Sequence, residues 1–109
     1  MAVELEFYTD EVVQEYNTAV EQAMKEAVLI VEADAKRLCA VDTGRLRASI
    51  TNEVREIANA VIEGRIGTNT DYAPYVFLGT SRQDPQPALR PALRNNFDKI
   101  VSIIQEAIE

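Results

Sequence analysis

Few residues of this chain could do chemistry, and they do not form a catalytic set. The 109 residues include no histidine, which removes the commonest general base and the commonest transition-metal ligand. The single cysteine, Cys39, therefore has no imidazole to activate it, and packing in a core or an interface is the simpler role. One cysteine also rules out an internal disulfide. The sequence thus predicts no enzyme, no cofactor and no metal site.

Two other patterns have a chemical and a simpler structural interpretation. Glu53, Glu56 and Glu63 could pair as carboxylates across a hairpin, but solvent-facing strand positions explain them more simply. Gly64 and Gly67 have the spacing of a phosphate-binding turn, yet they lie within a predicted strand and do not join a strand to a helix. The structural interpretation is favoured for both patterns.

The remaining charged candidates are suited to contact with another protein. Arg45 and Arg47 alternate with Leu46 directly after a turn. They could form ion pairs to another subunit, or they could be ordinary charges at the edge of a hairpin. Arg90 and Arg94 lie one turn apart at the start of a predicted helix, off its apolar stripe. All four arginines are candidate interface residues.

The segment YAPYVFLGTSRQDPQP, residues 72–87, fixes its geometry with two tyrosines and several prolines. Tyr72 and Tyr75 lie three residues apart on one side of a short helical turn. They could be core aromatics that close the sheet, or interface residues, because tyrosine is enriched at interfaces. Thr80 ends the turn, and Arg82 follows in a polar loop of a kind that often carries partner contacts.

Composition and charge limit the classes of function. A chain that is 47% hydrophobic and 27% charged is typical of one folded, soluble domain. No apolar run approaches the roughly 20 residues that span a bilayer, so we expect no membrane partner. The acidic N-terminus does not resemble a secretory signal, so we expect synthesis in the cytoplasm. The net charge is −7, and the first 40 residues hold an excess of acids that would repel DNA phosphates.

Hydrophobic periodicity predicts the first two elements. Val3, Leu5 and Phe7 alternate with polar residues, as in a short strand. Thr9 is then positioned to cap a helix over residues 10–39, which would be roughly 45 Å long at 1.5 Å per residue. Its apolar stripe consists of Val13, Tyr16, Val20, Ala23, Ala27, Val31, Ala35 and Leu38. We expect this helix to overhang a small domain and to offer part of its stripe to a partner.

The second half of the chain predicts a hairpin and a final helix. The triplet 42–44 ends the first helix, and two strands follow over residues 50–55 and 60–68. Pro91 favours a helix that starts near residues 87–89. Its stripe consists of Leu89, Leu93, Phe97, Ile100, Ile104 and Ile108. The whole is a single α+β domain, 1–109, with the N-terminal and C-terminal helices packed on a small antiparallel sheet in two layers.

Three segments in this order, VDTGRLRASI, GTNTDYAPYVFLGT and PQPALRPAL, resemble the small head–tail joining, or tail-completion, proteins of long-tailed double-stranded DNA phages and prophages. The resemblance covers about two-thirds of the chain. It matches the family's turn at Asp42, Thr43 and Gly44, and its following strand at Arg45, Leu46 and Ser49. The tyrosine turn matches at Tyr72, Ala73, Tyr75, Val76, Gly79 and Thr80. The helix opening matches at Pro87, Leu89, Arg90, Pro91, Ala92 and Leu93. The chain departs from the family at Phe77-Leu78, where an acid is common, and at Ala88, where an aromatic residue is common.

This resemblance implies a structural virion protein at the neck or upper tail, assembled in the host cytoplasm. It implies a ring of several copies, most simply a hexamer, around the DNA channel. The implied neighbours are head-completion or adaptor proteins and tail-terminator or tail-tube proteins, with passive contact to genomic DNA. A minor tail or tail-terminator subunit is an alternative that differs in ring position. A cytoplasmic protein- or nucleic-acid-binding module is a more distant one.

Overall fold

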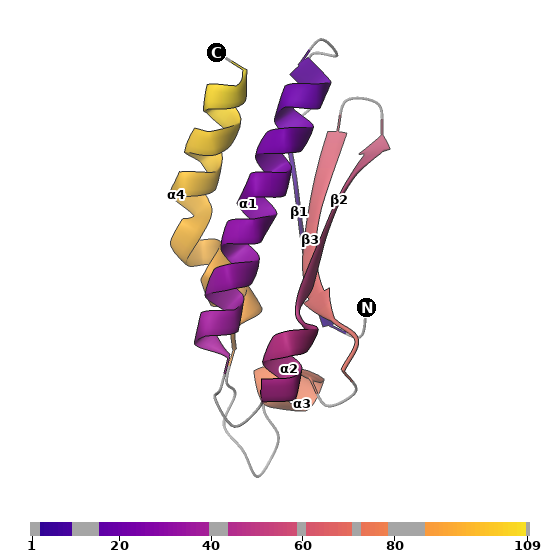
Figure 1. Ribbon diagram of the computed structural model, residues 1–109, viewed down its shortest axis with the longest axis vertical. Coiled ribbons are helices and arrows are strands. Elements are labelled where there is room, and N and C mark those ends of the chain that lie inside the picture. Colours follow the sequence, from indigo (N-terminus) through magenta and orange to yellow (C-terminus); the bar gives the residue numbers. More distant parts are fainter. Residues whose placement is uncertain are drawn as a thin grey trace.

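The chain folds into a three-stranded antiparallel sheet with two long helices, α1 and α4, beside it (Figure 1). The computed structural model describes residues 3–9, 16–39, 44–58, 61–70, 73–78 and 87–108. The elements in chain order are β1 (Val3–Tyr8), α1 (Asn17–Leu38), α2 (Gly44–Ser49), β2 (Thr51–Ala58), β3 (Val61–Thr68), α3 (Ala73–Leu78) and α4 (Leu89–Ala107). The predicted two-layer α+β class is confirmed.

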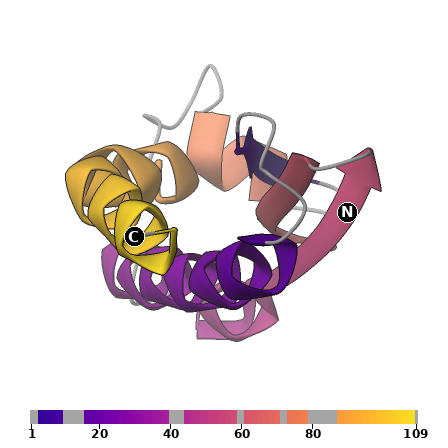
Figure 2. The ribbon, with the colours of Figure 1, turned by 90° about the horizontal axis from the view of Figure 1, so that it is seen from above.

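The sheet has the order β1-β3-β2, so the last strand in sequence lies in the middle. The predicted hairpin is present, with β2 extending to Ala58 beyond the expected residue 55. Along β3, Ile62 and Ile66 are fully buried and share a face, while Arg65 lies on the opposite face. Seen along the helices, β2 lies on the far side of α1 from α4 (Figure 2). The helix α1 packs on β2 and β3, and α4 packs on α1.

The stripe on α1 forms the centre of the core. Its buried residues are Val20, Ala23, Met24, Ala27, Val28, Val31 and Ala35. The sheet and α4 cover these side chains, so the stripe is closed from Val20 to Ala35, whereas Tyr16 at the start of the helix is 36% exposed. Cys39 follows the helix and is also buried in the core, as expected.

The start of α1 also differs from the prediction. The helix begins at Asn17, with Tyr16 as its N-cap residue, and at 1.5 Å per residue its 22 residues span roughly 33 Å. Thr9 does not cap it, because Thr9 extends the β1–β3 ladder. Its backbone N–H donates to the Ile62 carbonyl at 3.0 Å, and its hydroxyl accepts from the Ile62 N–H at 3.0 Å. Val13 and the other residues of the segment 10–15 lie outside the described residues.

The segment that follows the predicted turn is a short helix, α2, and not the strand implied by the resemblance at Arg45, Leu46 and Ser49. Leu46 is fully buried, and a residue on one side of a short helix can be buried as well as a residue in a strand. The Ser49 hydroxyl donates to the Leu46 carbonyl at 2.6 Å, a local bond that favours a turn over a strand. Asp42 and Thr43 lie outside the described residues.

The final helix, α4, is only partly covered. It begins at Leu89 and holds Pro91 in its first turn, as predicted. Leu89 and Ile100 are about 5% and 4% exposed, but Phe97 on the same stripe is 58% exposed and Ile108 is 42% exposed. The sheet therefore covers the predicted stripe of α4 incompletely, in contrast to that of α1.

A close approach of the sheet to α1 depends on Gly64 in the middle of β3. A Cβ atom at this position would lie 2.8 Å from the Met24 sulfur, 2.9 Å from Val28 Cγ1 and 3.0 Å from the Phe7 ring. These distances are shorter than van der Waals contact, so only glycine lets the strand sit this near the helix. Within the described part of the chain, no helix has both the length and the apolar character needed to cross a membrane.

Candidate functional site

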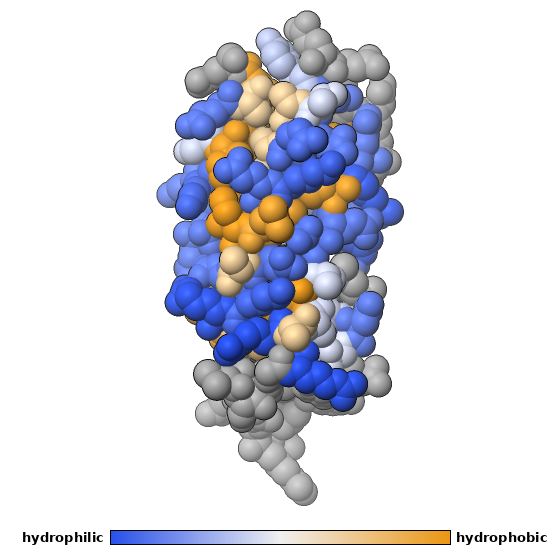
Figure 3. Space-filling view, viewed as in Figure 1, coloured by the Kyte–Doolittle hydropathy of each residue, from blue (hydrophilic) through white to orange (hydrophobic). Residues whose placement is uncertain are grey.

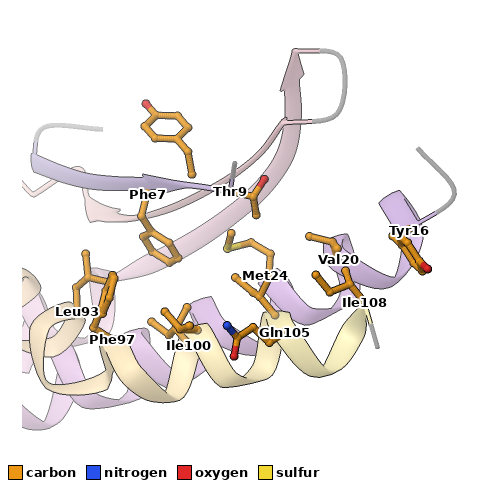
Figure 4. A pocket seen from close by; sticks show the side chains of 13 residues that line it. Phe7, Thr9, Tyr16, Val20, Met24, Leu93, Phe97, Ile100, Gln105 and Ile108 are labelled. Atoms are coloured by element: carbon orange, nitrogen blue, oxygen red, sulfur yellow. The ribbon is translucent and has the colours of Figure 1, made fainter. Parts of the chain in front are cut away.

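An apolar groove of about 520 Å³ lies between β1 and α4, with α1 contributing to its floor. Phe7 points from β1 toward Phe97 on α4, and Met24 extends from α1 into the same space (Figure 4). Ile100 and Ile104 complete the α4 side of the groove. Phe97, Ile100 and Ile104 belong to the predicted stripe of the final helix and Phe7 to the predicted strand, whereas Met24 is in neither. The opening between these residues could not be predicted from periodicity.

The groove continues as a shallower hollow along the N-terminal half of β1. Leu5, Arg90 and Arg94 line this hollow, and Leu93 and Phe97 belong to both parts. Both arginines are exposed, and neither makes an ion pair within the described part of the chain. The structure thus brings two predicted interface residues to one end of an apolar groove. We call the combined feature, from Leu5 to Thr9 on β1 and from Arg90 to Ile108 on α4, the β1–α4 groove.

The sheet face turned away from α1 carries a network of ion pairs. Arg65 contacts Glu4 and Glu6 on β1, and its Nε lies 3.5 Å from Glu63. Arg55 on β2 donates from its Nε to the Glu63 carboxylate at 3.0 Å. The Glu63 side chain is only 4% exposed, so the expectation that Glu63 faces solvent is wrong: its neighbours' guanidinium groups cover it.

This open face nevertheless remains acidic. Its four carboxylates and two guanidinium groups give a net charge of −2, from Glu4, Glu6, Glu53, Glu63, Arg55 and Arg65. Cross-strand pairing of opposite charges stabilises the sheet, and the excess negative charge gives the face an anionic field. The sequence showed the excess of acids, but only the strand register shows that these carboxylates share one face.

Hydrogen bonds within the network shift the pKa of three groups. The hydrogen bond from Arg65 lowers the pKa of Glu4, and the same contact raises the pKa of Arg65. Tyr8 donates its hydroxyl to the Glu6 carboxylate, which raises the pKa of Tyr8 to about 12. Each shift moves titration further from neutral pH, whereas a general acid or base works best with a pKa near neutral. The network is thus suited to holding fixed charges.

A cluster of hydroxyl groups lies where α2 meets the end of β3. Thr70 donates to the Ser49 hydroxyl at 2.8 Å, and Thr68, which is 1% exposed, donates to Thr70 at 3.1 Å. The cluster has no histidine beside it, because the chain contains none. It satisfies buried polar groups and fixes α2 on the sheet. Among the described residues, no group of three or more histidine, cysteine or acidic side chains could hold a metal ion.

The two arginines of α2 have different surroundings. Arg47 is half-buried and donates from Nη2 to the Cys39 carbonyl at 3.1 Å, which ties α2 to the end of α1. Its Nε is buried and has no hydrogen-bond partner among the described residues. Arg45 is exposed. Arg47 therefore supports the fold, and Arg45 remains available as an interface candidate.

The tyrosine segment is described only in part. The predicted helical turn around residue 74 is present as α3, where Phe77 is buried and Leu78 is 74% exposed. The side chain of Tyr75 lies outside the described residues. Tyr72, Thr80 and Arg82 lie outside them too, so their predicted interface roles stay predictions.

A second apolar area lies on the outer side of α1 and α4, away from the sheet. Figure 3 shows apolar residues gathered over these two helices. A small hollow between the helices is lined by Ala19, Ala23, Ile103 and Ala107, with Glu26 and Glu106 beside them. Leu29 is 56% exposed and lies three residues after Glu26, so it is on the same side of α1. The molecule thus presents two separate apolar surfaces, one on either side of the helix layer.

Comparison with known families gives one match. Residues 4–79 match the model of the HK97-gp10-like family, described as "Bacteriophage HK97-gp10, putative tail-component". The matched range begins in β1 and ends after α3, so it contains the sheet except for Val3, together with α1, α2 and α3. Neither the curated proteins nor the solved structures gave a match.

Proposed function

This chain belongs to the HK97-gp10-like family of phage tail components, and from that premise we propose that it forms a ring at the neck or upper tail and joins the head to the tail. The observation that carries the proposal is the family match, which spans more than two thirds of the chain. The tail-completion motifs at residues 41–50, 67–80 and 85–93 support the joining role. The proposed neighbours are a head-completion or adaptor ring and a tail-terminator or tail-tube ring.

The arrangement of apolar surfaces supports an assembly role. A ring subunit that joins a head to a tail contacts copies of itself and proteins of the adjoining rings, and these two kinds of contact need different surfaces. The β1–α4 groove and the outer area around Leu29 lie on different sides of the helix layer. Exposed apolar areas that are bordered by charged residues commonly mark protein–protein contacts. The proposed copy number is six, by resemblance to tail-completion proteins.

The acidic sheet face supports passive contact with DNA. A face with net charge −2, in a chain of net charge −7, repels phosphates and lets a duplex pass without adhering. A protein that holds duplex DNA neutralises several phosphates, and each contributes about −0.9 to the slope of log affinity against log salt. We expect no binding to duplex DNA in a fluorescence titration at low salt and micromolar protein. Submicromolar affinity that falls steeply with salt would contradict the passive role.

Assembly is the decisive test. A phage lacking this gene should produce separate heads and tails, and expression of the chain from a plasmid should restore joined, infectious particles. Native mass measurement at high protein concentration should show the ring, and electron microscopy of labelled particles should place the chain at the neck or upper tail. A chain that stays strictly monomeric and never enters a particle would refute the proposal.

A further inference from the structure

The helix layer of this protein is wider than its sheet. Two adjacent helices with a diameter of about 10 Å cover roughly 20 Å, whereas three strands spaced about 4.8 Å apart cover roughly 14 Å. The difference of about 6 Å is close to the width of one further strand. The uncovered helix is α4, whose Phe97 is 58% exposed, and the strand nearest to it is β1, at the edge of the sheet.

The outer edge of β1 presents backbone groups toward the missing strand position. In an antiparallel ladder, alternate residues direct both backbone groups toward the partner strand. The Thr9 N–H donates to the Ile62 carbonyl, so Thr9 and, by alternation, Phe7 face β3. The backbone N–H and C=O groups of Glu6 and Tyr8 therefore point outward, and no fourth strand pairs with them within the described residues. Such an edge is a template for strand addition.

We propose that the β1–α4 groove receives an extended strand of about six residues donated by a different protein of the virion. The length follows from β1, which has six residues. The added strand forms backbone hydrogen bonds to Glu6 and Tyr8, and its alternate side chains fill the groove over Phe97 and Ile100. Backbone bonds give such a complex its affinity, and the pockets for alternate side chains give it specificity.

A second copy of this chain does not fit the groove through its described strands. The helix α1 lies against β2 and β3, so a copy docking through its own β2 would bring its α1 within about 5 Å of α4. Two helix axes need about 8–10 Å. A copy docking through β1 would place Glu6 near its own counterpart, and like charges facing each other across strands are unfavourable. The β3 strand is already paired on both sides.

The surrounding charges specify the composition of the donated strand. Side chains on its groove side contact apolar residues of α4, so they are apolar. Side chains on its other side lie beside Glu6 and the acidic open face, so they are basic. Antiparallel addition, which is the commoner pairing, places the carboxyl end of the strand beside Leu5 and Arg90, where an acidic group is favoured. Alternating apolar and basic residues ending in an acid are therefore the expected pattern.

The test uses the full chain and a synthetic peptide of alternating valine and lysine with a glutamate at its carboxyl end. The control peptide alternates valine and glutamate and ends in lysine. Amide hydrogen exchange followed by NMR should slow at Glu6 and Tyr8 at least about tenfold when the first peptide saturates, because new backbone bonds protect these amides. The control peptide should bind at least about tenfold more weakly, as like charges would face Glu6.

Two matched variants locate the binding surface. Phe97→Ser and Leu29→Ser each remove one exposed apolar side chain from a long helix, at 58% and 56% exposure. Phe97→Ser should weaken binding of the valine–lysine peptide about tenfold or more, since buried aromatic residues dominate such contacts. Leu29→Ser should change it less than about twofold, because Leu29 lies on the outer side of α1.

Several outcomes would overturn the proposal. These are a lack of binding, unchanged exchange at Glu6 and Tyr8, equal binding of both peptides, or equal effects of the two variants. Protection of the same two amides by raised protein concentration alone would assign the groove to a second copy and overturn the choice of partner. The inference does not depend on ring formation, which native mass measurement reports separately, so either proposal can fail while the other stands.

Discussion

Replacing Gly64 with alanine tests how closely the sheet packs on α1. The new methyl group would lie 2.8 Å from the Met24 sulfur and 2.9 Å from Val28 Cγ1. Met24 ends in a flexible thioether that can shift, but Val28 is β-branched and fixed on the helix. The ring of Phe7, 3.0 Å away, limits movement on the third side. The strand and the helix must therefore separate, or Phe7 must move into the β1–α4 groove.

Two opposing effects set the size of the loss. Adding a methyl group to a tightly packed core costs about 1–3 kcal/mol of unfolding free energy. Replacing glycine with alanine in an unstrained strand regains about 0.4–1 kcal/mol, because the unfolded chain loses entropy. The net loss is about 1–2 kcal/mol. For a domain of about 100 residues, each kcal/mol lowers the melting temperature by about 4–8 °C, so we expect a fall of roughly 5–15 °C.

Thermal unfolding followed by circular dichroism measures this difference. Gly67→Ala is the matched control, because Gly67 is in the same strand on the face turned away from α1, and its melting temperature should not fall. Met24→Ala alone should cost about 2–5 kcal/mol through the cavity it leaves. The double variant, Met24→Ala with Gly64→Ala, should lose less unfolding free energy than the two single variants together, by at least about 0.5 kcal/mol. The smaller side chain at residue 24 makes room for the new methyl group, so each change relieves the other. A Gly64→Ala protein that melts at or above the wild-type temperature would refute the close-packing argument.

Three further predictions concern the charged groups. The lowered pKa of Glu4 means that the folded chain gains stability from this group above pH 4.5 and loses it as the pH falls further. The hydrogen bond from Arg65 is the largest cause, so acid titrations of both proteins should show a smaller difference in Arg65→Leu than in the wild type. Tyr8 should ionise at about pH 12 in an ultraviolet absorbance titration, against about 10 in the unfolded chain. Its contribution to stability is therefore lost as the pH rises between those values, and the titration of Tyr8→Phe should lack this step. Arg90→Glu should leave the melting temperature within about 2 °C, because an acid is favoured in a first helical turn, yet lower the yield of joined particles by at least about tenfold. The control is Lys99→Glu, at an exposed residue of α4 that does not line the groove, and it should not lower the yield. Unfolding of the Arg90 variant would show that Arg90 supports the fold.

The elements that depend on local pattern could be predicted from the sequence. The alternation around Leu5 gave β1, the steps of three and four gave both long helices, and Pro91 fixed the start of α4 to within two residues. The hairpin followed from alternation around Ile62 and Ile66. In each case the signal lies within about ten residues of the element, where periodicity is informative.

The features that depend on distant partners could not be predicted. Thr9 has the residue type of a helix cap, but its bonds go to Ile62, more than fifty residues away, and this partner competes with the cap. Glu63 has the pattern of a solvent-facing residue, but it is covered because Arg55 lies opposite on β2. Gly64 is needed because Met24 packs directly against it, and this contact cannot be predicted from the spacing of residues in the strand. Strand register and helix packing decide each of these, and neither is encoded by local spacing.

The same limit applies to the expectation that the first helix offers part of its stripe to a partner. An apolar stripe shows that a helix is covered, but the covering surface can belong to the same chain or to a partner. The stripe of α1 has the sheet on one side and α4 on the other, so it is covered from Val20 to Ala35. The stripe of α4 has only α1 and the edge of β1, and Phe97 and Ile108 remain open. Because three strands do not cover two helices, α4 carries an apolar stripe that the sheet leaves partly open. In the proposed assembly, α1 holds the domain together, and α4 with β1 receives the strand of a neighbouring protein.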